Sequence, residues 1–242
     1  VRGRRGLDIL NIIQKELANK WNIPHPELEL NDQQRYAYSQ WFDSFEYPSK
    51  YSSIKDAINQ IKMFLADWFW DYDPQPPIKH INDKITEYPL YPFEVRVYSD
   101  KFGYAGSIDA LCSINNENIL VDIKSNDKEE HEDYHLQTNG YFLALQELYP
   151  DLQINKINIL SMPKETSDKS KFYRYNFEDV SIDPTYWLIK VAKFYKQFEN
   201  EEPFNRISPI IYKNLLQYGI NPDEDLNKQK RQYKAQTKIY SH

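Results

Sequence analysis

The chain has 242 residues, enough to bury a full hydrophobic core, and 30 basic against 36 acidic residues give it a formal net charge of −6. This charge excludes a general coat protein for nucleic acid, because affinity for phosphate comes from lysine and arginine. The single cysteine, Cys112, excludes an internal disulfide and a cysteine cluster, and no apolar run approaches the roughly 20 residues of a membrane span, so we expect a reducing, cytoplasm-like compartment and no membrane partner.

Residues 1–90 are predicted to form a helical lobe that packs on the rest of the chain. Helices are expected over 7–21, 32–45 and 53–70, with helical character continuing to about Tyr88. Prolines follow the first and the third of these helices and stop them.

From residue 93 onward the hydrophobic period changes from helical to alternating, which is typical of strands. The expected elements are, in order, strands over 93–99, 104–114 and 119–125, a helix over 132–148, strands over 156–161 and 172–177, and a helix over 184–198. This succession predicts an α/β fold with a central mixed β-sheet flanked by helices, over 91–200. Residues 201–242 are expected to be a C-terminal extension with a basic tail.

Two carboxylates and a lysine stand near the ends of neighbouring predicted strands. Asp109 lies in one strand, and Asp122 and Lys124 close the next, on one face of it because side chains alternate along a strand. Mg²⁺ prefers oxygen ligands and keeps several waters, so the two carboxylates, with the carbonyl of Ile123, are sufficient for a site. Glu94, at the start of the preceding strand, is a candidate for a further ligand.

This pattern favours hydrolysis of phosphodiester bonds. A bound metal lowers the pKa of the attacking water and neutralises developing charge, and Lys124 can orient that water or help to deprotonate it. An Asp-x-Lys triplet by itself is typical of an ordinary solvated strand end. The apolar residues on both faces of 119–123 favour the functional interpretation, since charges that close a buried strand are costly.

The ordered set Glu94, Gly106-x-x-Asp109, Asp122-x-Lys124 and Gln137-x-x-x-Tyr141 resembles the RecB-like exonuclease branch of the PD-(D/E)XK nuclease superfamily. The resemblance covers roughly residues 91–198 and implies a restriction-endonuclease-like core. It further implies Asp109 and Asp122 as metal ligands, Lys124 as the catalytic lysine, Glu94 as an auxiliary acid, and Gln137 with Tyr141 as supports at the site.

The activity implied by this resemblance is a Mg²⁺-dependent deoxyribonuclease, with Mn²⁺ as a substitute. It would be an exonuclease acting on single-stranded or frayed DNA ends in recombination, repair or phage-type DNA metabolism. Two departures matter. No histidine follows Arg5-Gly6, which leaves the number of metal ions open, and the absence of a four-cysteine cluster excludes an iron–sulfur version. Ile108 stands where the proline that names the superfamily would be, which is a minor divergence.

Two alternatives remain open. A catalytically inactive nuclease fold could bind DNA without cutting it. The sequence His131-Glu132-x-x-His135 also matches the pattern of zinc metalloproteases, in which two histidines one turn apart bind zinc and the glutamate activates water. The latter motif lacks a convincing third ligand, and acids near the start of a helix are also favoured for purely structural reasons.

Overall fold

A computed structural model describes residues 4–23, 66–67, 73–81, 84–88, 90–124, 131–161 and 176–231. Its centre is one five-stranded sheet in the order β3-β4-β5-β6-β7. The strands are β3 (Phe93–Ser99), β4 (Tyr104–Ile114), β5 (Glu117–Lys124), β6 (Lys156–Ser161) and β7 (Asn176–Val180). Neighbouring strands are antiparallel except β5 and β6, which are parallel. The predicted α/β fold with a central mixed sheet and flanking helices is confirmed.

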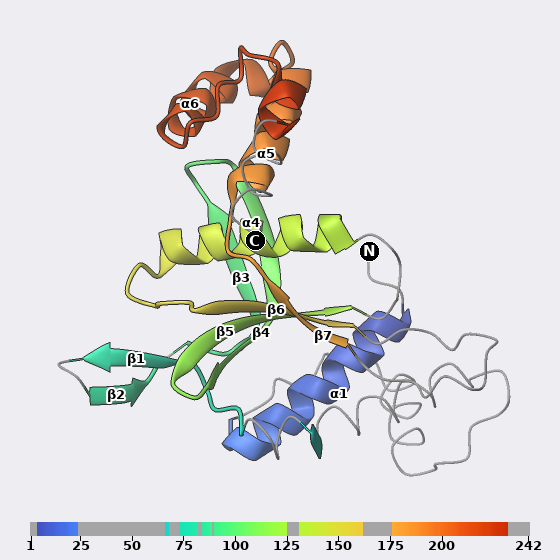
Figure 1. The fold of residues 1–242 in the computed structure, drawn as a ribbon, viewed down its shortest axis with the longest axis vertical. Helices are drawn as coiled ribbons and strands as arrows, with labels where there is room; N and C mark the ends of the chain where they lie inside the picture. The colour runs from blue at the N-terminus through green and yellow to red at the C-terminus, as the bar shows by residue number, and fades with distance from the viewer. Residues whose placement is uncertain are drawn as a thin grey trace, which may run out of the picture.

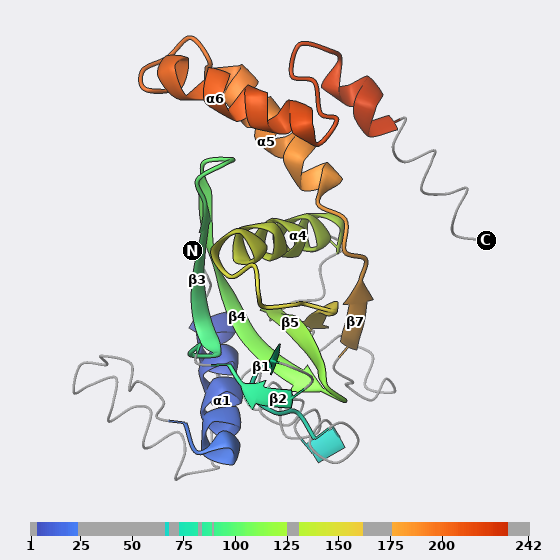
Figure 2. The same cartoon turned by 90° about the vertical axis from the view of Figure 1, so that its left-hand side faces the viewer.

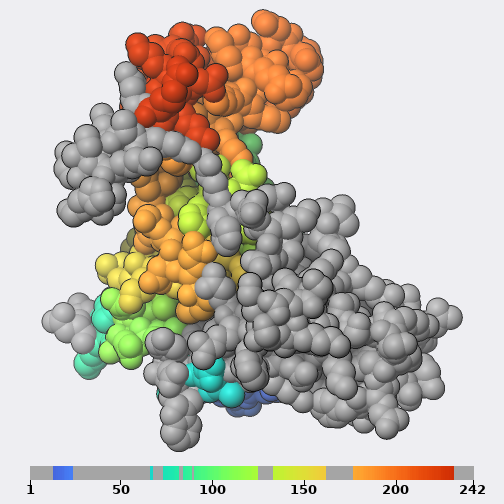
Figure 3. Space-filling model, turned by 45° about the vertical axis from the view of Figure 1, so that its right-hand side comes forward, coloured from blue at the N-terminus to red at the C-terminus, as the bar shows by residue number. Residues whose placement is uncertain are grey.

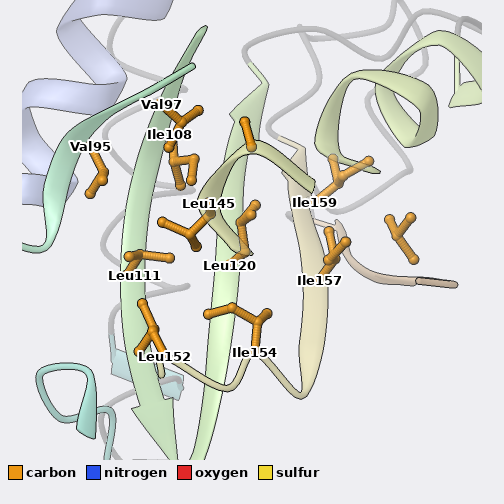
Figure 4. Close-up of a cluster of buried hydrophobic side chains, with 12 residues drawn as sticks. Val95, Val97, Ile108, Leu111, Leu120, Leu145, Leu152, Ile154, Ile157 and Ile159 are labelled. Atoms are coloured by element: carbon orange, nitrogen blue, oxygen red, sulfur yellow. The ribbon is translucent and has the colours of Figure 1, made fainter. Parts of the chain in front are cut away.

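A helix covers each face of this sheet. Helix α4 (His131–Leu148) lies on one face and α1 (Arg4–Trp21) on the other (Figures 1 and 2). On β5, Ile119, Val121 and Ile123 point into the layer with α1, whereas Leu120 points into the layer with α4. Both faces of β5 are therefore buried, as expected for a strand with a parallel neighbour. Figure 4 shows the α4 layer, in which Leu145 of α4 packs over apolar side chains from β3, β4, β5 and β6.

The alternation of faces is inverted at one level of β3 and β4. Phe93 packs in the α1 layer and Val95 in the α4 layer, although residues two apart on a regular strand share a face. The same change separates Ala110 from Ile108 on β4. Glu94, which lies at this level, has a φ of 46°, in the left-handed region that non-glycine residues rarely adopt. The change of face at Glu94 thus lets Phe93 and Val95, two residues apart, pack in different layers.

A short hairpin corrects the prediction that the chain is helical as far as Tyr88. Strands β1 (Ile78–Ile81) and β2 (Lys84–Glu87) pair in antiparallel fashion beside the central sheet (Figure 1). The side chain of Asn118 accepts a hydrogen bond from the N–H of Ile78 and donates one to its carbonyl, so tertiary contacts fix this four-residue strand. Of the three predicted N-terminal helices, the first is confirmed, whereas 32–45 and most of 53–70 lie outside the described residues.

The predicted strand bounds agree closely for β3, β4 and β6 but not for the last strand. The expected strand over 172–177 is observed as Asn176–Val180, paired with β6 from Ser161↔Asn176 to Ile157↔Val180. Val180 packs in the α4 layer, which is consistent with the register that pairs it with Ile157 of β6. Residues 162–175 lie outside the described part of the chain.

Helices α5 (Thr185–Phe198) and α6 (Phe204–Gln217) stand at one end of the molecule, above α4 (Figures 1 and 3). They pack on the β3–β4 turn, where the hydroxyl of Tyr195 donates to the carbonyl of Gly103. Gly103 has a φ of 63°, and a Cβ there would overlap the Tyr195 hydroxyl, so only glycine fits. Helix α6 was not predicted. Among the described residues, no helix has the length and apolar character needed to cross a bilayer.

Candidate functional site

The two predicted aspartates lie on neighbouring strands, just beyond the last paired residues of β4 and β5. Their register ends at Ala110↔Val121, and one residue further on Asp109 and Asp122 are both completely buried. The carboxylate of Asp109 bridges the strands there, because its Oδ2 accepts a 2.7 Å hydrogen bond from the main-chain N–H of Ile123. Since Ile123 directly follows Asp122, this bond brings the two carboxylates to the same point of the sheet.

Lys124 neutralises part of this buried charge. Its Nζ lies 2.6 Å from Oδ2 of Asp122, and its side chain is 15% exposed. The same ammonium donates a 3.0 Å hydrogen bond to Oε1 of Gln137 and lies 4.8 Å from the ring centre of Tyr134. A carboxylate, an amide oxygen and an aromatic face all attract a cation. The predicted proximity of Asp122 and Lys124 on one face of β5 is therefore observed.

Gln137 and Tyr141 hold Lys124 from the side of α4. Nε2 of Gln137 donates to the Tyr141 hydroxyl at 2.5 Å, which leaves Oε1 of the amide directed at the lysine. The ring of Tyr141 in turn lies so close against Gly106 that a Cβ there would overlap its Cε1. A glycine at this position of β4 thus permits the close approach of the tyrosine, and the four residues form one continuous support.

Glu94 is close in the fold but differently engaged. It is an exposed residue, and its Oε2 accepts a 2.8 Å hydrogen bond from Ser107 Oγ. Within the described ranges, no three His, Cys, Asp or Glu side chains gather as a metal-binding group. Asp109 and Asp122 are accordingly a pair of acids, and Glu94 as a ligand stays a prediction.

The donor set at this point suits a hard divalent cation. Two ionised carboxylates buried on neighbouring strands need a positive charge nearby, because desolvated like charges are costly. Both offer oxygen, which Mg²⁺ prefers, and Mg²⁺ completes its coordination with main-chain carbonyls such as that of Ile123 or with water. Asp109, Asp122 and Ile123 are the residues that would hold such an ion, and Lys124 would have to share Asp122 with it.

Two residues at the site were not predicted. Helical periodicity places Tyr134 on the apolar face of α4, and a single sequence gives no sign that its ring lies beneath an ammonium group. Gln14 of α1 is 3% exposed and donates a 2.9 Å hydrogen bond from Nε2 to the main-chain carbonyl of Asp109. A polar residue on a helix face otherwise formed by Ile13, Leu17 and Ala18 is a signal that could have identified it.

The histidine pair of the metalloprotease pattern is only partly within the described structure. Nε2 of His135 lies 3.0 Å from Oε1 of Glu178 on β7. The side chains of His131 and Glu132 lie outside the part that can be described. The protease alternative therefore stays a prediction that the described side chains do not test.

Comparisons with known proteins identify no family for this chain. No family model matches it, and no curated protein matches it. A solved structure titled "Crystal structure of SSO0001" is similar over 79% of this chain and 84% of that one, at 11% sequence identity and with a TM-score of 0.28.

Proposed function

We propose that this protein is a metal-dependent DNA nuclease whose site is formed by Asp109, Asp122 and Lys124. The observation that carries the proposal is the pair of completely buried carboxylates just beyond the last paired residues of β4 and β5, with an ammonium 2.6 Å from one of them. Burying ionised groups costs several kcal/mol each after relaxation. Such groups cluster at functional sites, which favours chemistry over a purely structural role.

The surroundings of the pair also support the proposal. The core runs as three antiparallel strands, a helix and a strand parallel to the third, with both acids on the central strands. This agrees with the arrangement implied by the resemblance to the RecB-like PD-(D/E)XK branch. Gln137 and Tyr141 are the most specific part of that resemblance; Gln137 contacts the lysine, and Tyr141 contacts Gln137.

Each residue has a role that follows from its contacts. Asp109 and Asp122 would bind Mg²⁺ or Mn²⁺, which supplies an activated water and neutralises charge on the phosphate. Lys124, held by Gln137, places a positive charge beside Asp122, where it can orient the water or stabilise the charge that develops on phosphate oxygens. Tyr141 fixes the orientation of the Gln137 amide and so the position of the ammonium.

The finer activity rests on the resemblance. It favours an exonuclease that acts on single-stranded or frayed DNA ends, in recombination, repair or phage-type DNA metabolism. Comparing end-labelled linear DNA with covalently closed circles would test this, since an exonuclease degrades only the former.

The decisive experiment is degradation of linear DNA with Mg²⁺, with Mn²⁺ and with a chelator. The variants Asp122→Asn and Lys124→Met keep side-chain size while removing a ligand and a charge. We expect each to lower the rate by at least about 10²-fold, the loss typical of removing one preorganised charge-stabilising group. Circular dichroism and thermal unfolding serve as folding controls. Undiminished degradation by folded Asp122→Asn would exclude the proposed site.

A nuclease fold that binds DNA without cutting it is the second candidate. The observation in its favour is that Lys124 already pairs with Asp122, so this carboxylate is neutralised by the chain itself. Calorimetric titration with Mn²⁺ separates the two candidates. A nuclease should bind the ion at Asp109 and Asp122 and lose it in Asp122→Asn, whereas a binding module should bind no Mn²⁺ there. A binding module should also hold DNA equally well with and without chelator.

A further inference from the structure

Gln14 makes a contact that links α1 to the main chain of the candidate site. It is almost completely buried, 95 positions before Asp109 in the sequence, and its Nε2 donates to the Asp109 carbonyl at 2.9 Å. Most of the neighbouring buried residues of α1 are apolar, including Ile13 and Leu17. A buried amide on such a face is retained only where it finds a partner.

The Asp109 carbonyl lies at an irregular level of the β3–β4 ladder. The register pairs Phe93 with Ala110 and Val95 with Ile108, but it does not pair the residues between them, Glu94 and Asp109. Leu111 donates to the carbonyl of Pro92, so regular alternation would make Glu94 and Asp109 the next hydrogen-bonded pair.

The left-handed backbone of Glu94, with a φ of 46°, explains the interruption. The Asp109 carbonyl accepts from the Gln14 side chain, so α1 contributes a bond at the level where the register omits a pair.

We propose that Gln14 is a positioning residue for Asp109. With the carbonyl held on one side by Gln14, the carboxylate of the same residue reaches the opposite strand and accepts from the N–H of Ile123 at 2.7 Å. The helix therefore sets the orientation of this carboxylate through the main chain of Asp109. As regards metal binding this inference rests on the proposed function, and as regards the geometry of Asp109 it stands independently.

A matched control is available on α4. Gln146 also donates from Nε2 to a main-chain carbonyl, that of Leu152, at 2.6 Å. This bond lies at the far end of α4 from Gln137 and Lys124. Gln14→Met and Gln146→Met each remove one side-chain donor to a main-chain carbonyl, although Gln146 is less buried than Gln14. Any effect specific to Gln14→Met then reports on Asp109.

The first measurement is hydrogen exchange of the Ile123 amide in the full chain without metal. We expect Gln14→Met to accelerate this exchange roughly three- to tenfold relative to neighbouring β5 amides, as the loss of one hydrogen bond would do. Gln146→Met should leave it unchanged. Gln14→Leu, which also removes the donor without adding a charge, is the second variant should the methionine protein fold poorly. Unchanged Ile123 exchange in a folded Gln14 variant would overturn the inference.

The second measurement is calorimetric titration with Mn²⁺ alone. Loss of a residue that orients a ligand typically weakens metal binding roughly 10- to 100-fold, and we expect this for Gln14→Met but not for Gln146→Met. Equal affinities in the two variants would contradict a positioning role. Should the unaltered protein bind no Mn²⁺, the proposed nuclease function fails, while exchange at Ile123 still decides the role of Gln14.

Discussion

Each end of β5 carries a buried polar side chain, but the chemistry that stabilises it differs between the two ends. At the start of the strand, Asn118 is 4% exposed, and its neutral side chain bonds to Ile78 and to the carbonyl of Gln153. At the other end, Asp122 is completely buried and pairs with the ammonium of Lys124. A neutral amide suffices to join β5 to its neighbours. The more costly ionic arrangement at the other end therefore calls for a reason beyond structure.

The largest expected effect on stability comes from separating the ion pair. Lys124→Met removes the ammonium that lies 2.6 Å from the buried Asp122 carboxylate, and removal of one member of a buried pair typically costs about 3–5 kcal/mol. The double variant Asp122→Asn with Lys124→Met should recover most of this loss. Urea denaturation of the four proteins measures the cycle. A double variant no more stable than Lys124→Met would mean that the pair does not act as a unit.

The neutral end should respond differently. Asn118→Ala removes three side-chain hydrogen bonds, two to Ile78 and one to Gln153, and at about 0.5–1.5 kcal/mol each the expected loss is about 2–4 kcal/mol. Urea denaturation again gives the value, and Mn²⁺ affinity should stay unchanged because the charged end is untouched. A large fall in Mn²⁺ affinity would show that the two ends are coupled.

A smaller effect is expected where Tyr141 contacts Gly106. Gly106→Ala places a methyl group in space that Cε1 of the tyrosine occupies, so the ring must move, at a cost of about 1–3 kcal/mol. The displaced hydroxyl should then lose its hydrogen bond with Gln137. The rate of DNA degradation should therefore fall even though the protein still folds. Tyr141→Phe removes the hydroxyl without moving the ring and is the matching control. Full activity in both variants would mean that this support is dispensable.

The smallest expected response is that of Cys112, which lies on β4 between the two ends. Burial raises the pKa of its thiol well above the usual range, so at pH 8 the reactive thiolate is scarce in the folded protein. Alkylation should be slow in buffer and fast in urea, where the pKa returns to its normal value and the thiol is accessible. Mass spectrometry follows the reaction. Fast alkylation of the native protein would show that the sheet opens readily near its centre.

Strong local patterns made most of the central sheet predictable. The alternating residues of β3 and β4 and the apolar run of β6 matched the observed strands, because burial on defined faces dictates both period and length. The hairpin of β1 and β2 was missed, since its four-residue strands are fixed by contact with the distant Asn118. Helix α6 was also missed.

The site was predictable where charge broke an apolar pattern. Asp122 and Lys124 stood out because they close a buried strand, and their pairing on one face followed from alternation. The bond from Gln14 to Asp109 joins residues 95 positions apart, at a level where the β3–β4 register omits a pair. No local sequence pattern predicts either feature. The backbone conformation of Glu94 is likewise invisible in a single sequence.

The inversion at Glu94 also has a consequence for folding. Because Phe93 packs with α1, whereas Val95 and Val97 pack with α4, β3 is anchored in both hydrophobic layers. Neither layer can unfold without disturbing a strand that also packs in the other layer. We therefore expect both layers to unfold in one cooperative transition. Asp109 and Asp122 should then keep their relative positions up to the point of global unfolding.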